Sequence, residues 1–302
     1  MAQSVADARD RARLMYDGAE YEQSLQAALE GLSSYPDDVE LLVLAGRAGI
    51  ELDDDDAVEH LRRATELAPD DASAWHHYGE ALAAEGRTPE ADTAFRRAVE
   101  LDPEDQLALT HLGHTALAAG HNEEGVGYLA RAADIAHAGA GASTASISLV
   151  DMYRSFGQYE DALAQARRLA DAAPDDVLTC LDVAELSAAV GQLDEARSAF
   201  ELLRELDDVP GHEAYPLHGL IQVEIQGGNW VRARELTQQA AAIDPRGLST
   251  DVAAFLREEE GEPGEEPAPT RTEVEEALAS SLADYRRMLA DDQRIGAGGV
   301  NG

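Results

Sequence analysis

The feature that most constrains this chain is a small side chain that returns at a nearly constant interval. Most intervals are close to 34 residues, and two are 37; the residues are Ser24, Ala57, Ala91, Gly125, Ala162, Ala196 and Ala233. In five units a proline follows the small residue after twelve positions; these prolines are Pro36, Pro69, Pro103, Pro174 and Pro245. In one of the other two units His137 takes the place of the proline, and in the other the proline, Pro210, lies two positions later. A period of this length predicts a stack of repeated supersecondary units.

The clearest unit covers residues 72–105 and predicts a pair of short helices. Its sequence is ASAWHHYGEALAAEGRTPEADTAFRRAVELDPED. Small residues let the helix backbones approach each other closely, and larger side chains fill the remaining space. The closing proline cannot continue the second helix, so the chain turns there. Asp71 and Asp176 each follow such a proline and are placed to cap the next helix.

This unit resembles the tetratricopeptide-repeat (TPR) family at eight signature positions. They are occupied by Trp75, Tyr78, Gly79, Leu82, Ala91, Phe95, Ala98 and Pro103. Six carry the residue that the family favours, and Tyr78 and Leu82 exchange its usual leucine and tyrosine. The resemblance implies an all-α, right-handed superhelical TPR solenoid of about seven helix-turn-helix repeats. It weakens at both ends, where Arg11 and Thr237 occupy core positions, so the first helix is expected to fray.

The register of the repeats divides the chain into five predicted segments. They are a TPR array over 1–247, with repeats that start near 5, 38, 72, 106, 143, 177 and 214; a solvating cap helix over 248–257; an acidic linker over 258–271; an amphipathic helix over 272–294; and a flexible tail over 295–302. The cap helix is predicted by analogy with the helix that closes many TPR arrays. The linker is rich in glutamate, proline and glycine, which predicts an extended or disordered segment.

The segment 272–294 has an apolar stripe of helical period. The stripe consists of Val274, Leu278, Leu282, Tyr285 and Leu289. Thr272 and Glu275 have the spacing of a capping box at its start. A lone helix leaves such a stripe in water, so it is expected to dock. It can pack on the last repeat, occupy the groove of its own array, pair with another copy of the chain, or be held by a partner.

The charge of the chain limits its partners. Asp and Glu total 60 against 23 basic residues, all of them arginine, for a net charge of −37. Such a surface repels phosphates, so we expect no nucleic-acid partner and no membrane partner. Abundant acid without lysine resembles the proteins of salt-in halophilic archaea. No signal peptide or membrane-spanning stretch is recognised, so a soluble, cytoplasmic protein is expected.

Signs of catalytic chemistry are few. No phosphate-binding, nucleophile-elbow or zinc-protease motif occurs, so we expect neither an enzyme nor a cofactor. The single cysteine, Cys180, falls at a core position of its repeat and is interpreted as a small hydrophobe. The alternative site is a histidine cluster that suits zinc or a similar metal, made of His76, His77, His111 and His114.

The TPR resemblance also assigns positions to the concave groove in which the family binds its partners. Carried over position by position, the groove residues are His76, His77, Glu80, Leu107, His111, His114, Ile147, Asp151, Arg154, Leu178, Glu185, Tyr215, His218 and Gln222. Some TPR co-chaperones hold acidic tails with a basic groove, and this groove lacks that basic set. Carboxylates beside apolar side chains instead favour an amphipathic or basic segment of a protein or peptide.

The function expected from the sequence is therefore a non-catalytic protein-interaction scaffold, such as a co-chaperone, an assembly factor or a regulatory adaptor. Two alternatives stay open. One is a metal-binding protein that uses the histidines of the groove. The other is a structural subunit that associates with itself, with residues 272–294 as the contact.

Overall fold

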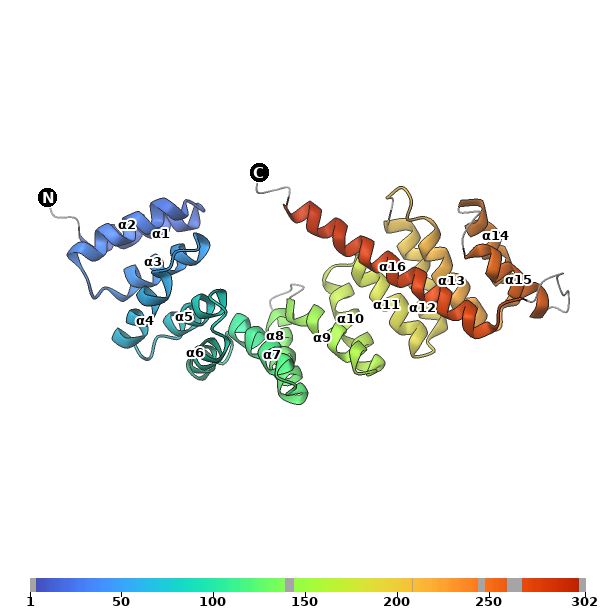
Figure 1. Ribbon diagram of the computed structural model, residues 1–302, viewed down its shortest axis with the longest axis horizontal. Coiled ribbons are helices and arrows are strands. Elements are labelled where there is room, and N and C mark those ends of the chain that lie inside the picture. Colours follow the sequence, from blue (N-terminus) through green and yellow to red (C-terminus); the bar gives the residue numbers. More distant parts are fainter. Residues whose placement is uncertain (1–3, 139–143, 208, 244–247, 260–267, 299–302) are drawn as a thin grey trace. The chain divides into compact units, whose positions relative to one another are not determined.

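The computed structural model describes the chain except for residues 1–3, 139–143, 208, 244–247, 260–267 and 299–302. The described residues form sixteen α-helices and no strand, which confirms the all-α prediction (Figure 1). They divide into two compact units. The amino-terminal unit comprises the described residues up to 138 together with 144 and 145, and the carboxy-terminal unit comprises those from 146 onward.

The amino-terminal unit is a series of helical hairpins. Its helices are α1 (Val5–Asp17), α2 (Tyr21–Ser34), α3 (Val39–Glu51), α4 (Ala57–Leu67), α5 (Ala72–Ala84), α6 (Thr88–Leu101), α7 (Gln106–Ala118) and α8 (Asn122–Ala138). Each helix packs on the next along the chain, and α1 on α3 and α3 on α5 also pack together. The first helices of the first three hairpins are therefore neighbours.

The carboxy-terminal unit continues the pattern and adds two helices. Its elements are α9 (Thr144–Ser155, from Ser146), α10 (Tyr159–Ala172), α11 (Val177–Ala189), α12 (Leu193–Leu206), α13 (Ala214–Gln226), α14 (Trp230–Ile243), α15 (Ser249–Glu259) and α16 (Arg271–Gly298). One apolar cluster runs through this unit from Val150 of α9 to Leu289 of α16. It includes Val252, Phe255 and Leu256, which form the buried face of α15.

Close approach of the two helices of a hairpin depends on the small residues that set the period. A Cβ atom on Gly79 of α5 would lie 2.7 Å from Cε1 of Phe95 on α6. Phe95 is fully buried in this contact. A larger side chain at Gly79 would push the two helices apart, which is the physical reason for the signature glycine.

The predicted aspartate caps are confirmed. Asp71 accepts hydrogen bonds from the backbone N–H of Ser73 and of Ala74 at the start of α5. Asp176 does the same for the N–H of Thr179 at the start of α11, at 2.8 Å. The residues after each proline therefore fix where the next hairpin begins.

Two local predictions were wrong. The first helix does form, since Ser4 and Asp7 make a capping box and Arg11 pairs with Glu30 of α2 instead of entering the core. The capping box of α16 is Thr270 with Glu273, where the N–H of Thr270 donates to Oε2 of Glu273 at 2.7 Å. Thr272 lies inside the helix, two residues later.

Several predicted features lie outside the described residues. They are Pro245, most of the linker and the last four residues of the tail. No helix in the part of the chain that the structure describes combines the length and the apolar character needed to cross a bilayer.

Candidate functional site: two helix faces

Ten of the fourteen predicted groove positions lie on two helix faces, one in each unit. We call the first the amino-terminal face; it consists of His76, His77 and Glu80 of α5 and Leu107, His111 and His114 of α7. We call the second the carboxy-terminal face; it consists of Asp182 and Glu185 of α11 and Tyr215, His218 and Gln222 of α13.

The carboxy-terminal face is occupied by α16. This helix packs on α11, α13 and α15, and Figure 1 shows it (red) running from α15 back across the hairpins of its unit. Its apolar stripe is buried, as the exposed fractions of Val274, Leu278, Leu282, Tyr285 and Leu289 are all 6% or less. Of the placements left open by the sequence, the structure therefore has docking within the chain, on the groove positions of α11 and α13.

A four-residue charge cluster anchors α16 to α11. Arg286 donates to Asp182 at 2.6 Å and to Glu185 at 2.5 Å. Arg154 of α9 pairs with the same two carboxylates. Burial alone lowers the pKa of Arg286, but the two facing carboxylates outweigh it, so the pKa is raised and the guanidinium stays charged. Such a cluster fixes the register of α16 along the face.

A tyrosine stack anchors α16 to α13. The rings of Tyr215 and Tyr285 are parallel, with centroids 4.9 Å apart. The hydroxyl of Tyr285 donates to Asp207, which also bonds to Nδ1 of His212 at 2.9 Å. Burial, followed by the hydrogen bond to Asp207, raises the pKa of the Tyr285 hydroxyl far above its usual range. The ring is fully buried, so its polar end depends on Asp207 for a partner.

Smaller polar contacts complete this interface. Nδ1 of His218 lies 2.7 Å from the hydroxyl of Ser281. A cavity of about 180 Å³ remains between the face and the helix, lined among others by Glu185, Gln222 and Leu282. The carboxy-terminal face thus recognises an amphipathic helix with a basic position, and that helix belongs to the same chain.

The amino-terminal face carries a compact group of two histidines and two carboxylates. Nδ1 of His76 lies 2.8 Å from Oδ2 of Asp105, and its Nε2 lies 3.4 Å from Oε1 of Glu80. Nδ1 of His77 lies 2.7 Å from Oε2 of Glu80. Asp105 is also the cap of α7, where it accepts from the N–H of Ala108. The group therefore links α5 to the start of α7.

The charges of this group stabilise one another. Burial lowers the pKa of His76, but the hydrogen bonds to Asp105 and Glu80 outweigh it and raise the pKa to about 9. Burial raises the pKa of Glu80, but the two histidines outweigh it and hold that pKa far below its usual range. His77 has a lowered pKa, chiefly because of burial. At neutral pH the imidazolium of His76 thus lies between two carboxylates.

The other residues of the amino-terminal face are arranged more loosely. The ring of His111 stacks on Phe95 with centroids 4.6 Å apart, and burial lowers its pKa. His114 is exposed, and Leu107 is 55% exposed. Of the four histidines proposed as metal ligands, the structure brings His76 and His77 together with Glu80, and leaves His111 and His114 outside that group.

The remaining predicted groove residues have different surroundings. On α9, Ile147 is 52% exposed and Asp151 is exposed, whereas Arg154 joins the charge cluster. Leu178 is half-buried against the core of its unit. Cys180 is buried, as its core position predicts, and burial raises the pKa of its thiol to about 11, which suits a structural role and not a nucleophile.

The sequence analysis missed the residues that support the two faces. Asp105 stands 29 positions from His76, Asp207 stands 78 from Tyr285 and Arg286 stands 101 from Glu185, so no local spacing indicates these pairs. The presence of an aspartate at a helix start predicts only the cap. The contact of Asp105 with His76 becomes visible only when the fold brings the start of α7 next to His76 of α5.

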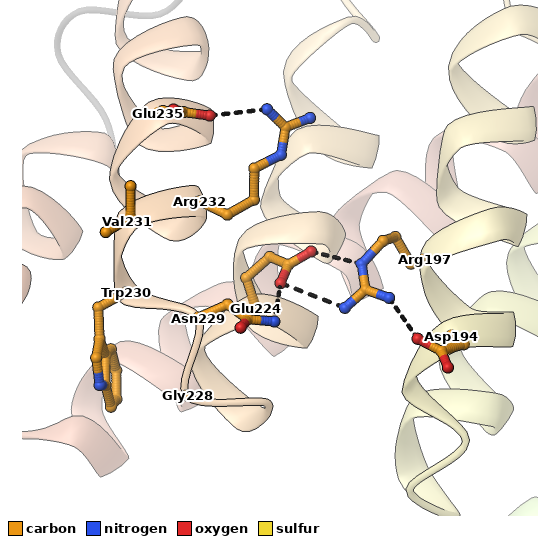
Figure 2. A pocket seen from close by; sticks show the side chains of 9 residues that line it. All are labelled: Asp194, Arg197, Glu224, Gly228, Asn229, Trp230, Val231, Arg232 and Glu235. Carbon is orange, nitrogen blue, oxygen red and sulfur yellow. Dashed lines mark hydrogen bonds and ion pairs between the residues drawn. The ribbon is translucent and has the colours of Figure 1, made fainter.

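A charged pocket on the carboxy-terminal unit was also missed. It has a volume of about 760 Å³, and Figure 2 shows Arg197 between Asp194 and Glu224 at its base. The carboxylate of Glu224 is 3% exposed and accepts from Arg197 at 2.6 Å and from Asn229 at 2.7 Å. These groups come from α12, α13 and the turn to α14. Their ion pairs and hydrogen bonds therefore connect neighbouring hairpins beside the pocket.

Comparisons with known proteins agree with this architecture. Residues 41–170 match the family model described as the cilia and flagella-associated protein 70 middle TPR-like domain. A crystal structure of the C-terminal part of a TPR repeat-containing protein from Cytophaga hutchinsonii is similar with 15% identity and a TM-score of 0.60, over 81% of this chain and 98% of that one. No curated protein matches the chain.

Two further solved structures have the same fold. The pilF protein of Pseudomonas aeruginosa is 18% identical, with a TM-score of 0.56, over 69% of this chain and 95% of that one. YrrB, described as a TPR protein with an unusual peptide-binding site, is 20% identical, with a TM-score of 0.51, over 64% of this chain and 96% of that one. The chain therefore has the fold of TPR solenoid structures, with a stack of helical hairpins in each unit.

Proposed function

We propose that the protein is a non-catalytic interaction scaffold that binds a segment of another protein on its amino-terminal face. The observation that carries the proposal is the difference between the two faces. Groove positions of the carboxy-terminal unit bind a helix, namely α16. The equivalent positions of the amino-terminal unit include the exposed side chains of Leu107 and His114.

The chemistry of α16 indicates what kind of partner suits such a face. This helix presents an apolar stripe and one arginine to a surface of carboxylates and aromatic rings. The amino-terminal face likewise combines Glu80 with the apolar side chain of Leu107. We therefore infer an amphipathic or basic partner segment, consistent with the net charge of −37. YrrB, whose description names a peptide-binding site, offers a precedent on the same fold.

Self-association through residues 272–294 is the weaker alternative. The apolar stripe of α16 is buried on its own unit, so a second copy would first have to displace the helix. Binding of an acidic tail is also disfavoured, because Arg154 is engaged with Asp182 and Glu185.

The acidic, lysine-free surface supports a place in a cytoplasm of high salt, as the sequence resemblance to halophilic proteins implies. Carboxylates at this density repel one another at low ionic strength. We expect the unfolding temperature to rise between 0.2 and 3 M KCl by roughly 10 °C or more, as net repulsion is screened. A melting temperature that stays constant would contradict this assignment.

The scaffold proposal is tested with two matched leucine variants. Proteins retained from a native high-salt lysate are compared for the wild type, for Leu107→Asp on the amino-terminal face, and for Leu67→Asp at the end of α4. Leu67 is 43% exposed, against 55% for Leu107, so both variants alter solvent-facing leucines. We expect Leu107→Asp alone to lose a retained protein. Identical sets for all three proteins would refute the proposed face.

A further inference from the structure

The group at His76 has the donor atoms and the geometry of a metal site. His76, His77 and Glu80 each offer one ligand atom, and these atoms all lie within 4.8 Å of one another. The three residues share one face of α5, because Glu80 is four positions after His76 and three after His77. Two ligand atoms at about 2.0–2.1 Å from a tetrahedral ion lie roughly 3.3 Å apart, so shifts on the order of 1 Å suffice.

The contact between His76 and Asp105 is also one that suits a metal-binding histidine. Its Nδ1 bonds to Asp105 at 2.8 Å, which leaves Nε2 directed at Glu80. A carboxylate on the far nitrogen is the usual way in which proteins orient a metal-binding histidine. Asp105 is itself fixed, since it caps α7 and is half-buried. Edge-to-face contacts of the His76 ring with His77 and with Phe95 hold the imidazole from the sides.

We propose that His76, His77 and Glu80 bind one divalent metal ion, with Asp105 as the positioning residue of His76. Two imidazole nitrogens and one carboxylate oxygen form a donor set that suits Zn²⁺ or Co²⁺ better than Mg²⁺ or Ca²⁺. Binding displaces the proton that His76 carries between its two carboxylates. Three protein ligands leave a fourth position, which water fills. The proposal does not depend on any partner of the amino-terminal face.

The test is a titration of the full-length, metal-free protein with Co²⁺, followed by visible absorption. The many surface carboxylates bind cations weakly through water, so a tetrahedral Co²⁺ spectrum distinguishes the histidine site from them. We expect saturation at one equivalent per chain and displacement of the cobalt by Zn²⁺. Absence of a saturable tetrahedral spectrum in the wild type would overturn the proposal.

Variants locate the site. His77→Ala and Glu80→Gln each remove one ligand and should weaken Co²⁺ binding at least tenfold, and Asp105→Asn should weaken it roughly ten- to a hundredfold. His121→Ala is the matched control, since His121 is an exposed histidine of the same unit, outside the group. Circular dichroism melts establish that each variant is folded. Unchanged binding in both ligand variants, or loss of binding in His121→Ala, would also overturn the assignment.

Discussion

The two helix faces differ in how their polar groups are satisfied. In the carboxy-terminal unit, Asp182 and Glu185 pair with an arginine that arrives from α16, about 100 residues later in the chain. In the amino-terminal unit, Glu80 pairs with histidines of its own helix and shares His76 with Asp105. Buried carboxylates need partners in both units. One unit obtains them in part from the helix that it binds, and the other obtains them from α5 itself and leaves Leu107 and His114 of its face exposed.

Groove positions of a TPR array can therefore be identified from the sequence even where a helix of the same chain covers them. Positions assigned to a groove by family resemblance receive a helix in one unit of this protein, and in the other they include the exposed side chains of Leu107 and His114. Substitutions in α16 can measure how strongly this helix is bound to the carboxy-terminal face. Because Trp75 and Trp230 lie one in each unit, the Trp75→Phe background lets Trp230 fluorescence report the carboxy-terminal unit alone.

The largest expected effect is that of Tyr285→Ala. It removes a fully buried ring, its stack on Tyr215 and one of the partners of Asp207, so we expect a loss of about 3–5 kcal/mol in the unfolding free energy of the carboxy-terminal unit. Urea unfolding followed by Trp230 fluorescence measures it. Glu276→Ala, at an exposed position of the same helix, is the control and should cost less than about 1 kcal/mol. Equal effects of the two variants would mean that α16 is not docked through its stripe.

Arg286→Ala should have an intermediate effect. It leaves Asp182 and Glu185 with only Arg154 as a cationic partner, so we expect a loss of about 1–3 kcal/mol in the same measurement. The neighbouring Arg287→Ala is the control, because the side chain of Arg287 is 75% exposed and pairs with Asp284 of its own helix. It should change stability by less than about 0.5 kcal/mol. If both variants behave alike, the charge cluster does not anchor the helix.

Ser281→Ala should have the smallest effect. The hydroxyl that it removes lies 2.7 Å from Nδ1 of the buried His218, so we expect a loss of about 1 kcal/mol. Ser280→Ala replaces an exposed serine one position earlier and should be neutral within about 0.5 kcal/mol. A difference of zero between the two serine variants would show that this hydrogen bond contributes nothing to docking.

Much of the fold was predictable because the repeat is a local pattern. The small residue, the proline and the aspartate of each unit together specify the hairpin, its end and the next cap, and Gly79 shows why the small residue is needed. A local pattern cannot decide between two residue pairs that have the same spacing. Thr270 with Glu273 and Thr272 with Glu275 both fit a capping box, and only the structure selects the first pair.

The site was predictable only in part, for the same reason. The stripe of α16 showed that this helix would dock, but its surface depends on pairs such as Tyr285 with Asp207, 78 positions apart. The histidines of α5 were recognised as possible ligands, yet Asp105, which orients His76, comes from the cap of another helix. Contacts that a fold creates between distant residues leave no periodicity for sequence analysis to detect.

The most direct test of the central claim is hydrogen exchange of the full-length protein, measured peptide by peptide by mass spectrometry. The claim is that α16 is a docked part of the carboxy-terminal unit, and an undocked helix of this kind would exchange quickly because it is only marginally stable in water. We predict that residues 278–289 are protected to the same degree as α13, and that Tyr285→Ala removes the protection of α16 first. Exchange of residues 278–289 at the rate of an unstructured peptide in the wild type would contradict the account.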